Sequence, residues 1–245
     1  MKEVRREKSS LFVSTVSIFA ALTTISDVIW ESPFPYSDVW LSWIFIMEPI
    51  TGILLTPYAS FLSTLLGVMV GHSLRYIDIY EFAFTLGAPL GAMISSLLFR
   101  GKWKPALAYY LLLLGVYSLS PISWSLPIYG MWDVYLAFAC LLMAILIIVR
   151  KAEAWKLGSY RSFYVSALCA FIGLEADVLF RIFLLVPCQT YRIFYGWKAT
   201  DLQVIWATGA IETPIKAGLA ALVSAIIIPS IMKSLKNSSF IQIGY

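Results

Sequence analysis

Residues 132–150 read WDVYLAFACLLMAILIIVR, and this almost unbroken apolar run decides the fold. A helix needs about 20 apolar residues to cross the hydrocarbon core of a bilayer, so the run has the length of one membrane span. Lipid is the solvent in which such a helix can leave its side chains uncovered. The sequence therefore predicts an all-α membrane protein. Other apolar runs of about this length are candidate membrane spans as well.

The composition agrees with a membrane environment. Of the 245 residues, 60% are hydrophobic and 13% are charged, whereas an ordinary soluble domain has about 25% charged residues. The mean hydropathy is +0.81, which is more apolar surface than a soluble core of this size hides. These values exclude a disordered chain, a secreted disulfide scaffold and a soluble nucleotide-fold enzyme.

The residues that usually mark metals, cofactors or nucleic acids are scarce. The three cysteines are scattered, and His72 is the single histidine, so no metal-binding spacing exists. We expect no metal and no cofactor. The net charge of +4 comes from short basic clusters between apolar runs, and therefore we expect no nucleic-acid partner.

We predict a single integral membrane domain over residues 1–245, built as a polytopic bundle of about eight helices. The eight predicted spans are 11–30, 40–56, 57–74, 82–99, 105–121, 132–150, 162–187 and 204–232. The second and third are separated only by the step from Thr56 to Pro57. They are therefore either two tightly joined helices or one broken helix.

Basic residues give the predicted orientation. They cluster in the tail 1–10, at 100–104, at 150–161 and in the tail 233–245. Eight spans bring all four clusters to one face, which the positive-inside rule assigns to the cytoplasm. We therefore expect a multi-pass protein of the plasma membrane with both termini inside. A seven-span model would put the basic C-terminal tail outside.

Several ionisable residues fall inside predicted spans, where each costs about 2.5–3.5 kcal/mol. They are Glu48, Glu175, Asp177, Arg181, Glu212 and Lys216. The last four form two acid–base pairs at the favourable i,i+4 spacing. Such pairs either clip helices together or line a polar binding site. Glu48 and Glu175 lack a local partner, so we expect them to contact a polar ligand or to pair with Lys216 or Arg181.

Proline accompanies two of these charges. Pro49 follows Glu48, and Pro214 lies between Glu212 and Lys216. Proline removes a backbone donor, and such breaks at membrane depth are tolerated where the freed groups face protein or water. We therefore rank both places first among candidate binding sites.

Aromatic residues are frequent in the predicted outer loops. The tryptophans there are Trp30, Trp40, Trp124 and Trp197. One interpretation is the aromatic belt of the membrane interface. The other is a set of stacking or gating groups over a site that opens to the outside.

Small residues form faces on three predicted helices. Ser14, Ser17 and Ala21 share one face of the first span, and the pairs Gly67/Gly71 and Gly87/Gly91 follow in the third and fourth. Such faces let helices approach closely. They serve either packing within the chain or docking onto another membrane protein.

Enzyme motifs are missing from the sequence. It has no P-loop, no dinucleotide fingerprint and no HExxH, so we expect a chain that is not an enzyme and does not itself hydrolyse ATP. The segment Glu175–Arg181 is faintly similar to the EExxxR motif of intramembrane CAAX-type proteases. Ala176 breaks the acid pair, and no histidine follows His72. An intramembrane hydrolase remains a minor alternative.

Four stretches resemble the substrate-binding S components of energy-coupling factor (ECF) vitamin transporters. They are Ser17–Leu22 after the basic N-terminus; Glu48–Gly52 with Gly67–Gly71; Gly87–Ala92 with Arg100–Trp103; and Glu212–Ala217 with Pro229–Lys233. The first is similar to the family's first helix, whose small-residue face meets a transmembrane coupling subunit. The others are similar to its glycine- and proline-punctuated second and third helices, the following helix with its basic exit, and the last helix.

The resemblance implies a function and a set of site residues. The chain would bind a vitamin-like small molecule from outside, while a transmembrane coupling protein and cytoplasmic ATPases drive uptake. Substrate contacts would come from Glu48, Glu175, Arg181, Glu212 and Lys216 with the four loop tryptophans, and partner docking from Ser14, Ser17 and Ala21. Family members have six helices, so the chain would add a helix pair around 100–150.

Two further classes remain open. An ion-coupled secondary transporter would move protons or sodium through the same carboxylates, and an internal repeat would indicate it. The two halves show no convincing self-similarity. A structural or assembly membrane protein would use its buried charges only as ion-pair clips.

Overall fold

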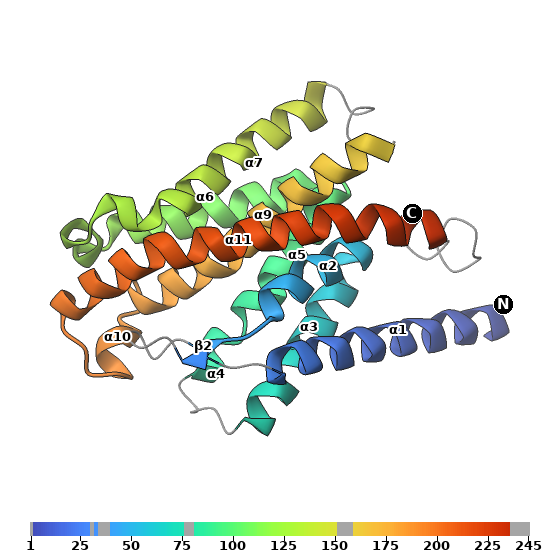
Figure 1. Cartoon of the computed structure of the whole chain (residues 1–245), viewed down its shortest axis with the longest axis horizontal. Coiled ribbons are helices and arrows are strands. Elements are labelled where there is room, and N and C mark those ends of the chain that lie inside the picture. The colour runs from blue at the N-terminus through green and yellow to red at the C-terminus, as the bar shows by residue number, and fades with distance from the viewer. Residues whose placement is uncertain (1, 30–31, 34–39, 76–80, 151–158, 236–245) are drawn as a thin grey trace.

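The computed structural model describes residues 2–29, 32–33, 40–75, 81–150 and 159–235, and these form a helical bundle (Figure 1). The long helices are α1 (Lys2–Val28), α2 (Ile44–Leu54), α3 (Pro57–Leu74), α5 (Gly87–Phe99), α6 (Trp103–Leu119), α7 (Trp132–Arg150), α9 (Ser159–Leu185) and α11 (Ala199–Leu235). Each predicted span overlaps one of these eight. The all-α prediction is confirmed.

Short elements connect the long helices at the end of the bundle where α11 begins. They are the helices α4 (Glu81–Phe84) and α10 (Thr190–Ile193), and the 3-10 turns η1 (Pro121–Ser125) and η2 (Ile128–Met131). The two-residue strands β1 (Ser32–Pro33) and β2 (Trp40–Leu41) pair antiparallel. These pieces matter because several of them border the cavity described below.

The second and third spans are two separate helices. Leu55 follows α2 in an extended conformation (φ −101°, ψ 161°), and Thr56 caps the next helix, accepting a hydrogen bond from the Ala59 N–H at 3.4 Å. Pro57 occupies the first helical position, where its missing N–H costs nothing. The Thr56 cap and Pro57 therefore begin a new helix, α3, which is separate from α2.

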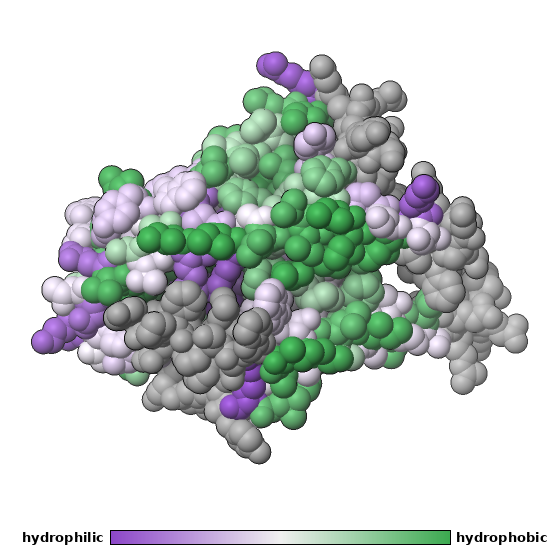
Figure 2. All heavy atoms as spheres, in the orientation of Figure 1, coloured by the Kyte–Doolittle hydropathy of each residue, from purple (hydrophilic) through white to green (hydrophobic). Residues whose placement is uncertain are grey.

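Length and composition identify a membrane protein. Within the described residues, four helical segments are long and apolar enough to cross a bilayer: Ser10–Val28, Glu81–Phe99, Ile128–Arg150 and Ala199–Ser234. Large apolar side chains on these segments stay exposed, among them Ile18, Leu146 and Ile226. Figure 2 shows a band of hydrophobic side chains across the middle of the visible face. Lipid is the environment that such a surface fits.

The start of α1 and the end of α11 lie at the same end of the bundle (Figure 1). The α2–α3 turn joins them there, because Leu55 and Ala59 pack on Val16 of α1. The α5–α6 turn lies beside the last turn of α7, where a Cβ built at Gly101 would be 3.9 Å from Ile148. Basic residues near 100–104, Arg150 and Lys233 therefore lie at one end of the bundle.

Helix α9 forms the centre of the core. The fully buried Tyr110 of α6 donates its hydroxyl hydrogen to the Ile172 carbonyl of α9 at 2.6 Å, and Tyr109 does the same to Ala176 at 2.8 Å. These two bonds join the turns of α9 on either side of Leu174. They fix the height of α9, and hence of its charged residues, relative to α6.

Glycine lets α5 cross α9 closely. A Cβ built at Gly91 would lie 2.6 Å from the Gly173 carbonyl oxygen, and one at Gly173 would lie 2.8 Å from the Gly91 oxygen. Gly67 and Gly71 in turn face Thr23 and Asp27 of α1. Both predicted glycine faces therefore serve packing within the chain.

We predict that Gly91→Ala destabilises the protein, whereas Gly115→Ala does not. The new methyl group at position 91 meets backbone that has little room to move, and overpacking of this kind costs roughly 1–3 kcal/mol. Gly115 lies in α6 with open space around it, where alanine favours the helix by up to about 1 kcal/mol. Melting temperatures of both variants in one detergent test this. Equal melting temperatures would contradict the close crossing.

Candidate functional site

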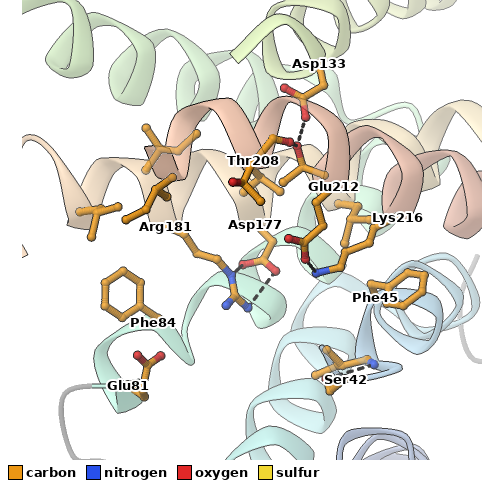
Figure 3. Close-up of a pocket in the computed structure, with 18 of the residues that line it drawn as sticks. Ser42, Phe45, Glu81, Phe84, Asp133, Asp177, Arg181, Thr208, Glu212 and Lys216 are labelled. Carbon is orange, nitrogen blue, oxygen red and sulfur yellow. Dashed lines mark hydrogen bonds and ion pairs between the residues drawn. The ribbon is translucent and has the colours of Figure 1, made fainter. Parts of the chain in front are cut away.

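A cavity of about 280 Å³ lies toward the end of the bundle where α11 begins, away from the start of α1 (Figure 1), and Figure 3 shows its lining. Its walls come from the last turn of α1, the start of α2, the end of α3, α4, the η2–α7 junction, the second half of α9 and the first half of α11. Most of these segments are far apart in sequence. The lining combines charged side chains with aromatic ones, as many small-molecule sites do.

The first ion pair of the cavity joins Asp177 and Arg181 on α9. The guanidinium donates from Nε to Oδ1 at 2.8 Å and from Nη2 to Oδ2 at 3.1 Å, which is the two-point geometry of strong arginine–carboxylate pairs. Gly87, the first residue of α5, leaves room for the Asp177 carboxylate. The carboxylate therefore also lies at the positive end of a helix.

The second pair joins Glu212 and Lys216 on α11, and both side chains face the cavity (Figure 3). Pro214 lies between them, yet α11 stays one continuous helix over Ala199–Leu235. Both predicted i,i+4 pairs thus form. Each is partly open to the cavity, so each can serve as a structural pair and still meet a ligand.

A third ionic group joins α1 to α3. Asp27 lies 3.5 Å from Nη1 of Arg75 and 3.7 Å from Nε2 of His72. The other ring nitrogen of His72 is hydrogen-bonded to the Thr85 hydroxyl at 3.0 Å. Sequence reasoning missed this group because Asp27 and Arg75 are 48 positions apart. Only the close packing of α1 on α3 brings them together.

Asp133 is a further lining residue that sequence reasoning missed. It lies in the first turn of α7, is 1% exposed and accepts hydrogen bonds from the Val134 N–H at 2.9 Å and from the Thr213 hydroxyl. The Thr213 bond ties α7 to α11. In the sequence, Asp133 is the second residue of the apolar run 132–150, and no spacing there marks it as a site residue.

Glu48 and Glu175 do not line the cavity. Both are fully buried, and within the described part of the chain neither carboxyl oxygen of either residue has a hydrogen-bond partner. Glu48 occupies the space that the missing side chain of Gly91 leaves. Lys216 and Arg181 pair with Glu212 and Asp177 instead. The expected pairing of Glu48 or Glu175 with either base is therefore not formed.

The predicted tryptophans have different places. Trp197 lines the cavity and stacks on Tyr195 with ring centroids 4.5 Å apart. Trp124 is 74% exposed, lies outside the cavity lining and donates to the Ser118 carbonyl at 2.9 Å. Trp30 and the side chain of Trp40 lie outside the described residues.

Further aromatic residues complete the lining. Phe45, Phe84 and Trp206 were not expected there from the sequence, whereas Tyr195 lies in the same aromatic outer loop as Trp197. Tyr195 donates its hydroxyl hydrogen to Glu81 at 2.5 Å. The sequence holds no spacing that would connect these two residues, because they are 114 positions apart.

The predicted docking residues lie far from the cavity side of α1. Ser14, Ser17 and Ala21 are exposed, whereas Val16, Thr23 and Asp27 are buried on the opposite side of the same helix. The small-residue face of α1 is thus not used for packing within the described chain. This distinguishes it from the two glycine faces.

The chemistry that this site offers is the binding of a polar small molecule. Charged groups and aromatic rings surround a space of suitable size, and hydrogen-bonding groups face it from several helices. No group of three or more histidine, cysteine, aspartate or glutamate residues within the described ranges is placed to hold a metal ion.

We predict that removing one charge of the Glu212–Lys216 pair harms folding more than removing both. Glu212→Gln or Lys216→Met strands a charge at membrane depth, at a cost below the ~3–5 kcal/mol of a fully buried pair, because the pair borders the cavity. The double variant strands none. Melting temperatures of the three variants test this. A double variant that melts below both single variants would contradict it.

No protein-family model, curated protein or solved structure matches this chain. The function is therefore inferred from the cavity, its charges and its place in the bundle.

Proposed function

We propose that the chain is a membrane-embedded substrate-capture subunit of the ECF S-component kind. It binds a small, polar, vitamin-like molecule from outside the cell, and a transmembrane coupling protein with cytoplasmic ATPases drives the uptake. The observation that carries this proposal is the cavity, which is lined by three ionic groups at one end of the bundle while the basic clusters lie at the other.

The orientation follows from the positive-inside rule. Basic residues near 100–104, Arg150 and Lys233 gather at the end that carries the start of α1. Cytoplasmic loops of membrane proteins carry such an excess. In this proposal the basic end therefore faces the cytoplasm of a plasma-membrane protein, both termini are cytoplasmic, and the cavity opens outward.

The first helix supports a partner. Helix α1 packs mainly against α2 and α3, and its face of Ser14, Ser17 and Ala21 is exposed. Small residues on an uncovered membrane helix allow close approach of another helix. The chain has no P-loop of its own, so in this proposal ATP hydrolysis is the work of separate subunits.

An ion-coupled secondary transporter is the second candidate. The observation that favours it is the pair of fully buried carboxyls, Glu48 and Glu175, which have no hydrogen-bond partner within the described chain. Carboxyls at membrane depth often carry protons or cations. Uptake by the purified chain alone in liposomes, driven by an ion gradient, would favour this candidate over the first.

The main prediction separates ligand binding from assembly. The purified chain should retain a small molecule, detectable by mass spectrometry after denaturation. The double variant Asp177→Asn/Arg181→Gln should lose it, since it neutralises the cavity pair without stranding a charge. Ser17→Leu should retain the ligand but fail to copurify a coupling protein and ATPases, because it fills the exposed face of α1.

Thermal stability is the control for both variants. Ser17→Leu should melt like the unmodified chain in the absence of partners, because its side chain is exposed. A loss of stability there would show that the face serves folding and would count against docking. If the unmodified chain copurifies with no small molecule and transports none, the proposed function is wrong.

Labelling with an impermeant maleimide tests the orientation. Cys188 is exposed near the cavity end, so intact cells should label it. In a Cys188→Ala background, Lys102→Cys should be labelled only after permeabilisation, because residue 102 is exposed at the basic end. Labelling of residue 102 from outside would show that the basic end faces outward, which contradicts the proposed orientation.

A further inference from the structure

The charges that line the cavity are not balanced within the described chain. The three strong bases there, Arg75, Arg181 and Lys216, each contact a carboxylate, from Asp27, Asp177 and Glu212 respectively. Among the described residues, the donors to the other two lining carboxyls are neutral: the Tyr195 hydroxyl for Glu81, and the Val134 N–H and Thr213 hydroxyl for Asp133. The excess charge that faces the cavity is therefore negative.

Glu81 lies in an aromatic corner of the cavity. It opens α4, and Phe84 lies one turn later on the same helix (Figure 3). Tyr195 and Trp197, from the segment after α10, complete the corner: the Tyr195 ring stacks on Trp197 at 4.5 Å and lies 6.4 Å from Phe84. All four side chains line the cavity.

This combination suits a positive charge. The faces of aromatic rings carry negative potential and attract cations, most strongly where water is excluded. Tyr195 donates one hydrogen to Oε1 of Glu81, which leaves acceptor capacity on the carboxylate. A cation in the corner would meet ring faces and a carboxylate together.

The described chain does not supply that cation. Arg181 is close enough for its charge to act on Glu81, but its guanidinium makes its two-point contact with Asp177. A metal ion is a poor fit, because no cluster of three or more ligating side chains occurs within the described residues. An anionic ligand would be repelled by Glu81 and would find all three bases already paired.

We propose that the corner formed by Glu81, Phe84, Tyr195 and Trp197 binds the positively charged group of a small organic cation, a quaternary ammonium or a protonated amine. The inference rests on the proposed function and names its substrate class. The rest of the ligand extends toward the Asp177–Arg181 and Glu212–Lys216 pairs, which offer both donors and acceptors to its polar groups.

Two probes of one shape test the cation subsite. They are choline and its neutral isostere, in which carbon replaces the quaternary nitrogen. The readout is the melting temperature of the full chain in detergent as the concentration of each probe rises. Choline should stabilise the chain at concentrations roughly tenfold lower than the isostere, the preference expected from a partly buried cation–π and carboxylate contact.

Variants test whether choline binds at the corner. Glu81→Gln keeps an acceptor for Tyr195 but removes the charge. It should weaken the binding of choline by about tenfold and change the binding of the isostere little. Asp201→Asn is the matched control, because Asp201 is exposed at the start of α11 outside the cavity. If Glu81→Gln does not fold, Trp197→Leu replaces it, since it removes one ring face and keeps Glu81.

Each outcome decides between the proposals. Equal effects of choline and its isostere, no effect of choline, or equal losses in Glu81→Gln and Asp201→Asn would overturn the cation subsite. A retained ligand that proves neutral or anionic would also overturn it while leaving substrate capture intact. A chain that binds choline as described but retains and transports no small molecule would keep the subsite and remove the proposed function.

Discussion

The close crossing of α5 over α9 at Gly91 and Gly173 is the contact on which the cavity depends. It brings the two backbones together so tightly that neither position accepts a side chain. One turn earlier, Gly87 leaves room for the Asp177 carboxylate, while Gly91 leaves room for Glu48. Glycine spacing on α5 therefore sets two things at once: the height of α9, and the places where its neighbours hold acidic side chains inside the bundle.

Charge pairing explains how the bundle tolerates so many ionisable residues. A lone charge at membrane depth is costly, whereas a paired one is much less so. Asp177 with Arg181, Glu212 with Lys216 and Asp27 with Arg75 are such pairs, and they come from three different walls of the cavity. Their bases are already engaged by this pairing. The lining groups that are not paired with a base are carboxylates and aromatic rings, both of which attract positive charge. We therefore expect the cavity to prefer cationic ligands.

Local patterns in the sequence predicted what local physics determines. Apolar run length predicted the eight long helices, and i,i+4 spacing predicted both ion pairs. The Thr56-Pro57 step left open whether α2 and α3 are separate, and the cap at Thr56 decides for two helices. Contacts between residues far apart in the sequence are not marked by any local sequence pattern. Glu81 meets Tyr195 and Asp133 meets Thr213 over separations of 114 and 80 residues. The rotation of α2 and α9 also had to be known, because it buries Glu48 and Glu175 outside the cavity lining, and so did the path of the η1 turn, which leaves Trp124 outside the cavity.

Helix α1 joins the two surfaces that the proposed function needs. One side carries Asp27, which borders the cavity and contacts Arg75 and His72 of the α3 end. The other side carries the exposed Ser14, Ser17 and Ala21. Helix α1 packs mainly against α2 and α3, and within the described residues it contributes no side chain to the core cluster around Tyr110. In the proposed function, a partner on the outer face and a substrate in the cavity would therefore contact opposite sides of a single helix. Any coupling between the two binding events through α1 would be reciprocal, because linkage requires it.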